Sequence, residues 1–137
     1  MKNSNPQTKK QKILVVEDEP AICHICSRTL GSEGFEVDIA TNGSLAEKVL
    51  AEKNDYDLLL VDIRTPIMDG QQLYQSIVEK HPQLAGRVVF TTGDVLGGDT
   101  KGFLKQSGRL YLPKPFTPDE LKTIVREALK QVENESG

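Results

Sequence analysis

Five short apolar runs recur along this chain, with segments of helical character between them. The runs are Ile13–Val16, Phe35–Ala40, Leu58–Val61, Val88–Thr92 and Leu110–Leu112. The first and third are continuously apolar, which is typical of strands buried on both faces. The second alternates with polar residues and therefore predicts an edge strand. Together the runs predict an α/β fold, a single doubly wound parallel (βα)5 sheet with right-handed crossovers and helices on both faces.

Local signals predict where the intervening helices begin and end. The expected helices are Pro20–Leu30, Ser44–Lys53, Gly70–Lys80, a short one around Thr100–Gln106, and Thr117–Val132. A proline opens the first and a glycine follows it, while the last begins with a capping box, Thr-Pro-Asp-Glu. In the second helix we expect Leu45, Val49 and Leu50 to share the core face.

Length and composition indicate one globular domain. The chain has 137 residues, with 17 basic and 20 acidic side chains and a net charge of −3. This balance argues against a nucleic-acid partner, and no apolar run approaches the roughly 20 residues that span a membrane. The polar N-terminus lacks a signal-peptide core, so we expect a cytoplasmic protein. We predict tails at residues 1–11 and 133–137 around a domain at 12–132.

Chemically active residues cluster where the predicted strands end. Glu17, Asp18 and Glu19 follow the first run, Asp62 ends the third, Thr91 and Thr92 end the fourth, and Lys114 follows the fifth. In a doubly wound sheet, ligands bind beyond the carboxyl ends of the strands. One acidic residue there is commonly a solvated loop residue or a helix cap. Four compatible strand ends instead predict a site for Mg²⁺ and a phosphoryl group.

Four segments resemble the receiver domain of two-component response regulators. They are Val15–Glu19, Leu60–Gly70, Phe90–Gly93 and Leu112–Phe116, and the resemblance spans about residues 12–132. It implies a flavodoxin-like sheet of strand order 2-1-3-4-5. Thr65 stands where methionine is usual in the family, which we expect to affect packing more than chemistry. The glycine-rich segment 93–108 is similar to receivers attached to hybrid sensor histidine kinases.

The resemblance also implies a role for each strand-end residue. Asp62 would be the phosphoacceptor, and Thr92 and Lys114 would bind phosphoryl oxygens, with a cis peptide between Lys114 and Pro115. The Mg²⁺ ligands would be Glu17, Asp18, Asp62 and the backbone carbonyl of Arg64. Thr92 and Tyr111 would form a switch that changes the surface of the fourth helix, fifth strand and fifth helix. We also expect Arg64 and Asp94 to reach each other across the mouth of the site.

The implied partner is a histidine kinase or a histidine phosphotransfer protein, with a homodimer through the switch surface as a further association. The domain would undergo phosphorylation and slow dephosphorylation on itself, so it would not be an enzyme acting on a separate substrate. The alternative is a degenerate receiver that serves only as a protein-docking module. The complete set of Asp18, Asp62, Thr92 and Lys114 argues against that alternative.

Other chemistries lack their residues. A P-loop motif is missing, and a haloacid-dehalogenase-type phosphatase would need an aspartate at the position of Arg64. Cys23 and Cys26 lie inside the first predicted helix, where a redox pair would not sit, and a zinc site would need more ligands than the chain offers nearby. Cys26 shares a helix face with apolar residues and is expected in the core.

Overall fold

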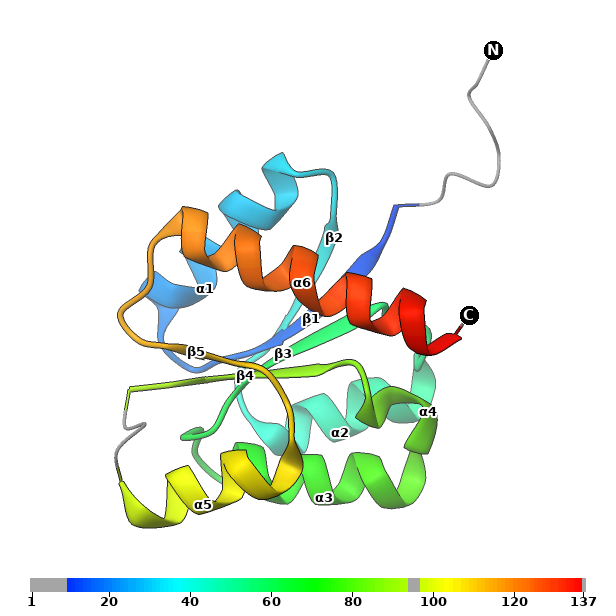
Figure 1. Cartoon of the computed structure of the whole chain (residues 1–137), viewed down its shortest axis with the longest axis vertical. Helices are drawn as coiled ribbons and strands as arrows, with labels where there is room; N and C mark the ends of the chain where they lie inside the picture. Colours follow the sequence, from blue (N-terminus) through cyan, green and yellow to red (C-terminus); the bar gives the residue numbers. More distant parts are fainter. Residues whose placement is uncertain (1–9, 94–96, 137) are drawn as a thin grey trace.

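The computed structural model describes residues 10–93 and 97–136. Its centre is a five-stranded parallel sheet in the order β2-β1-β3-β4-β5 (Figure 1). The strands are β1 (Lys12–Val16), β2 (Glu36–Ala40), β3 (Leu58–Asp62), β4 (Val88–Thr92) and β5 (Tyr111–Pro113). This confirms the predicted fold class and strand order, with β2 at one edge as its alternating pattern indicated.

Helices cover both faces of the sheet (Figure 1). On one face lie α1 (Pro20–Ser32) and α6 (Pro118–Ser136). The other face carries α2 (Gly43–Glu52), α3 (Gly70–Lys80), α5 (Gly98–Ser107) and the single-turn α4 (Pro82–Ala85). Among the described residues, no helix combines the length and the apolar character that crossing a membrane requires.

Two apolar cores result, one on each face of the sheet. Along β1, Ile13 and Val15 pack toward α1 and α6, whereas Leu14 and Val16 pack toward α2 and α3. Successive side chains of a strand point to opposite faces, so a strand covered on both sides must be apolar at every position. This explains the continuous apolar runs. It also leaves the strand ends as the place for polar side chains.

The helices differ from their predicted extents at several points. Helix α1 continues through Gly31 to Ser32, and α6 runs to Ser136, so residues 133–136 are helical where we expected a tail. Helix α5 is also longer than predicted. Residues 1–9 of the expected N-terminal tail lie outside the described residues.

The predicted core face of α2 was wrong at one position. Leu45 is 42% exposed, whereas Ala46 and Leu50 are buried. The Asn42 side chain accepts a hydrogen bond from the Leu45 backbone N–H and starts the helix at Gly43. Ala46 and Leu50 then lie one turn apart on the inner face, which directs Leu45 outward.

Candidate functional site

Three strand ends bring one lysine against three carboxylates. Lys114 follows β5, and its Nζ lies 2.8 Å from Oε1 of Glu17, 3.0 Å from Oδ2 of Asp62 and 3.0 Å from Oε1 of Glu19. Glu17 and Glu19 follow β1, and Asp62 ends β3. The peptide between Lys114 and Pro115 is cis, as the resemblance implied. The sheet thus assembles the predicted acceptor, acidic residues and lysine in one place.

Backbone hydrogen bonds fix these residues at the sheet edge. The Glu17 N–H donates to the Ala40 carbonyl (3.0 Å), and the Lys114 N–H donates to the Thr92 carbonyl (2.8 Å). The Ile63 N–H, directly after the acceptor, donates to the Thr91 carbonyl (3.0 Å). The parallel ladder therefore continues past the strand ends and anchors the backbone of the site to the sheet.

Burial and ion pairing shape the electrostatics of the cluster. Glu17 is 1% exposed and Asp62 is 3% exposed. Burial raises the pKa of Glu17 to about 7, against the opposing effect of hydrogen bonds from Lys114 and the Glu19 backbone. Burial alone would lower the pKa of Lys114, but its hydrogen bonds to Glu17, Asp62 and Glu19 outweigh this and raise it. The one positive charge of Lys114 thus faces three carboxylates, so the cluster carries an excess of acidic groups.

The acidic residues can hold a metal ion. Carboxylate oxygens of Glu17, Asp18 and Asp62 lie within 4.8 Å of one another, with Asp18 exposed and the other two buried. An all-oxygen set with one open side fits Mg²⁺, which retains several waters. The Arg64 N–H donates to Oδ1 of Asp62 (3.1 Å), so the chain turns around the acceptor. The Arg64 carbonyl as a fourth ligand stays a prediction.

The loop between β3 and α3 is held by hydrogen bonds to the Met68 carbonyl. Thr65 Oγ1 donates to it at 2.8 Å, and the Gly43 N–H at 3.0 Å. Thr65 therefore has a hydrogen-bonding role in addition to the packing role that we expected. At the end of the loop, a Cβ on Gly70 would lie 2.7 Å from the Asp62 carbonyl oxygen, so only glycine fits behind the acceptor.

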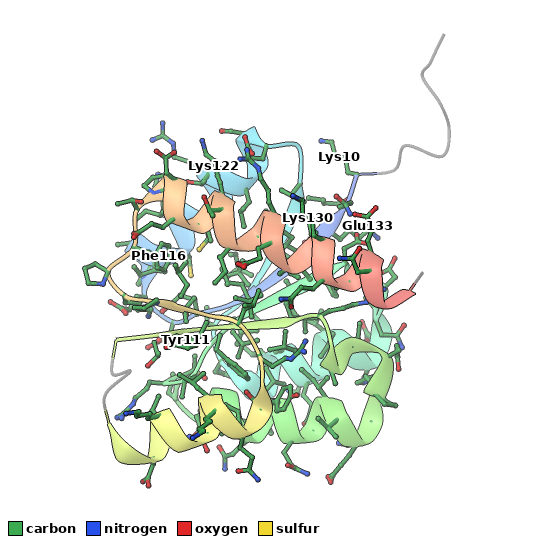
Figure 2. The ribbon with its side chains drawn as sticks, in the orientation of Figure 1. Lys10, Tyr111, Phe116, Lys122, Lys130 and Glu133 are labelled. Atoms are coloured by element: carbon green, nitrogen blue, oxygen red, sulfur yellow. The ribbon has the colours of Figure 1, made fainter. Side chains whose placement is uncertain are left out.

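The predicted switch residues lie at two different depths. Thr92 and its neighbour Thr91 are buried at the end of β4, whereas Tyr111 is 44% exposed. Tyr111 begins the edge strand β5, between α5 and α6 (Figure 2). The two residues thus occupy neighbouring strands, with Tyr111 at the surface.

Two cavities open beside the cluster and share the exposed Arg64. One, of about 250 Å³, is lined by Glu19, Asp62, Arg64, Gly93 and Lys114. The other, of about 530 Å³, lies between Asp18, the β3–α3 loop and the first turn of α5. Asp94, the expected partner of Arg64, lies outside the described residues.

Sequence reasoning missed the contact of Glu19 with Lys114. The only signal was a third consecutive acidic residue after β1, which carries no information on where the side chain points. By contrast, Cys26 is fully buried, as expected, and the Cys23 thiol donates to the Glu17 carbonyl (3.3 Å).

Comparisons with known proteins identify the family of this chain. The chain matches the family model described as the response regulator receiver domain over residues 13–126. It is 34% identical over 128 residues to response regulator Rre1 of Synechocystis, covering 91% of this chain and 55% of that protein. For the transcriptional regulator NtrC of Escherichia coli K12 the values are 33% over 124 residues, 90% and 26%. The chain therefore spans only part of these relatives.

Solved structures give the same result. A CheY-like receiver domain protein from Methanospirillum hungatei superposes with a TM-score of 0.83 at 27% identity, covering 93% of this chain and 99% of that one. The receiver domain of sensor histidine kinase PA1611 from Pseudomonas aeruginosa has a TM-score of 0.78 at 30% identity, covering 89% and 99%. That structure has a magnesium ion coordinated in its active-site cleft. This chain belongs to the response regulator receiver domains of two-component systems.

Proposed function

We propose that this domain accepts a phosphoryl group from a phosphohistidine onto Asp62, with Mg²⁺, and thereby switches its partner-binding surface. The donor is a histidine kinase or a histidine phosphotransfer protein in the cytoplasm. One observation carries the proposal: a buried aspartate stands within 3.0 Å of a lysine ammonium and within 4.8 Å of two further carboxylates. This is the arrangement that phosphoryl transfer to a carboxylate needs.

The reaction is one displacement at phosphorus. A carboxylate oxygen of Asp62 forms a bond to phosphorus, and the bond from phosphorus to the donor's imidazole nitrogen breaks. The product is an acyl phosphate, and the departing imidazole nitrogen retains the electron pair and takes up a proton. Lys114 is already 3.0 Å from the acceptor, so its ammonium can stabilise charge on the transferred oxygens.

Mg²⁺ would neutralise the charge on the phosphoryl oxygens. Glu17, Asp18, Asp62 and the Arg64 carbonyl are its proposed ligands, and Thr92 would donate its hydroxyl to a phosphoryl oxygen. The domain changes only itself, so each transfer ends with a modified protein rather than with turnover of a separate substrate.

The proposed output surface consists of α5, β5 and α6. Thr92 moves toward the phosphoryl group, and Tyr111 turns inward from its exposed position beside these elements. Such a local charge event biasing a two-state element is a general form of regulation. The same surface is the proposed contact of a phosphorylated homodimer.

Incubation with Mg²⁺ and a small phosphodonor, acetyl phosphate, tests the acceptor. The wild-type chain should gain one hydroxylamine-labile phosphoryl group by intact mass, and Asp62→Asn should gain none while keeping the same far-UV circular dichroism. Labelling that persists in Asp62→Asn would move the acceptor elsewhere. A folded wild-type chain that never becomes labelled would instead favour the docking module.

A further inference from the structure

Glu19 stands at the start of α1 but does not stabilise that helix through its side chain. It occupies the N-cap position, where aspartate, asparagine or serine commonly accepts a hydrogen bond from the first turn, and its side chain makes no such bond. Its backbone is nevertheless fixed at both groups: the N–H donates to Oε2 of Glu17 and the carbonyl accepts from Cys23. The side chain is therefore free to serve another purpose, and it reaches Lys114 at 3.0 Å.

The ammonium of Lys114 has no hydrogen-bond donor to spare. It carries three N–H groups, and three carboxylates lie within 3.0 Å of Nζ, those of Glu17, Glu19 and Asp62. Binding a phosphoryl oxygen on Asp62 therefore requires that Lys114 release one of these partners.

Burial decides which partner leaves. The Glu17 side chain is only 2% exposed, so losing the lysine would leave a desolvated carboxylate unpaired at high cost. Asp62 carries the phosphoryl group itself and therefore stays beside the ammonium. The Glu19 side chain is 61% exposed, and water can replace the lysine there. Glu19 also lines the 250 Å³ cavity together with Asp62 and Lys114, where an incoming phosphoryl group would lie.

We infer that Glu19 is a positioning residue that occupies Lys114 until a phosphoryl group displaces it. Its carboxylate is an anionic placeholder, by which we mean that it competes with the phosphoryl oxygens for the ammonium of Lys114. The inference rests on the proposed phosphoacceptor function. It assigns to Glu19 the effect of weakening the binding of a phosphoryl group at this site. Removing the carboxylate should therefore make phosphoryl binding easier.

Beryllofluoride with Mg²⁺, a phosphoryl mimic that binds carboxylates, provides a direct measurement. Glu19→Gln should lower the beryllofluoride concentration that gives half-saturation about two- to fivefold, the size expected for one exposed ion pair. Saturation can be followed by the amide NMR signals of residues around Asp62, which needs no turnover. The rate of labelling by acetyl phosphate should rise by a similar factor.

Asp99→Asn is the matched control. This substitution removes the same charge as Glu19→Gln, from an exposed position in the first turn of α5. Asp99 lines the neighbouring 530 Å³ cavity rather than the cavity that contains Lys114. If Glu19 acts through Lys114, this control should change the half-saturation point by less than about 1.5-fold. An equal effect of both variants would mean that the general field of the acidic mouth is responsible, and would overturn the inference.

A structure of the Mg²⁺–beryllofluoride form gives the second readout. Lys114 should contact a fluoride while keeping Glu17, and Glu19 should point into solvent. Retention of the contact between Glu19 and Lys114 in that form, or wild-type affinity in Glu19→Gln, would refute the placeholder role alone. Failure of the wild-type chain to bind beryllofluoride at all would refute the proposed function instead, so the two failures are distinguishable.

Discussion

The two ends of the sheet carry charged groups that are arranged in opposite ways. At the amino ends of the strands, Lys12 pairs with Asp55 at 3.0 Å, and the Lys12 backbone N–H donates to Asp57. The Lys12 and Asp55 side chains are 30% and 62% exposed. At the carboxyl ends, one lysine faces three carboxylates, two of which are buried.

The charged groups at the amino ends form a matched ion pair, whereas those at the carboxyl ends leave an excess of carboxylates that a cation can bind. An exposed pair of one cation and one anion contributes little to stability, and it leaves no excess charge that could attract a ligand. A buried surplus of carboxylates carries a repulsion that a cation would relieve. The carboxyl end should therefore respond to metal, pH and phosphoryl donors, and the amino end should respond to none of them.

The largest expected contrast concerns Mg²⁺. Binding to the folded state alone should stabilise it by about 2.7 kcal/mol at a hundredfold excess over Kd. Asp18→Ala should lose most of the resulting rise in Tm, because Asp18 is the exposed member of the acidic cluster and one of the proposed Mg²⁺ ligands. Thermal unfolding across a Mg²⁺ titration measures this. An undiminished shift in Asp18→Ala would show that the ligand assignment is wrong.

A smaller effect should appear as pH dependence in metal-free buffer. The pKa of Glu17 is raised from 4.5 to about 7, so the folded state holds this proton more tightly than the unfolded state does. The resulting stability is fully present below pH 4.5 and is lost as the pH rises through about 7. We expect a loss of about 1–3 kcal/mol from this group.

Urea unfolding at several pH values, with EDTA present, isolates the contribution of Glu17. Glu17→Gln should flatten the decline between pH 4.5 and 7, because the amide resembles the protonated acid. Glu36→Gln, at an exposed position on β2, should keep the wild-type profile. Parallel profiles for Glu17→Gln and the wild type would show that Glu17 does not cause the decline in stability between pH 4.5 and 7.

The smallest effect is expected at the amino end. Lys12→Met removes the ion pair with Asp55 but keeps the backbone hydrogen bond to Asp57. Tm should change by no more than about 4 °C, with the Mg²⁺ shift and acetyl phosphate labelling unchanged. Loss of either response in Lys12→Met would erase the distinction between the two ends.

Much of the fold followed from the sequence because burial on two faces leaves a plain pattern. Continuous apolar runs such as Ile13–Val16 located the central strands, and the alternation of strands with helices gave the topology. Helix ends were harder, because Gly31 and the residues after Val132 carry no signal strong enough to stop a helix. The outward orientation of Leu45 depends on where the Asn42 cap starts α2, and the observed start at Gly43 differs from the predicted start at Ser44 by one residue.

The sequence predicted which polar strand ends meet at one edge of the sheet, but not the contacts that they make there. Asp62 and Lys114 could be placed at strand ends, since parallel strands end at a common edge. That Lys114 would also bind Glu19 could not be foreseen, because it depends on the conformation of an exposed side chain. The hydrogen bond from Thr65 to the Met68 carbonyl was missed for a related reason, as it depends on the path of a loop.

The contact between Lys114 and Asp62 also has a temporal consequence. Lys114 lies 52 positions after Asp62 in the chain. At about 5–20 residues per second, a ribosome delivers the acceptor roughly 3–10 seconds before the lysine that compensates it. During that interval the nascent chain carries acidic strand ends without their ammonium. On the proposed mechanism, a chain that ends before Lys114 should therefore be a poor acceptor of phosphoryl groups.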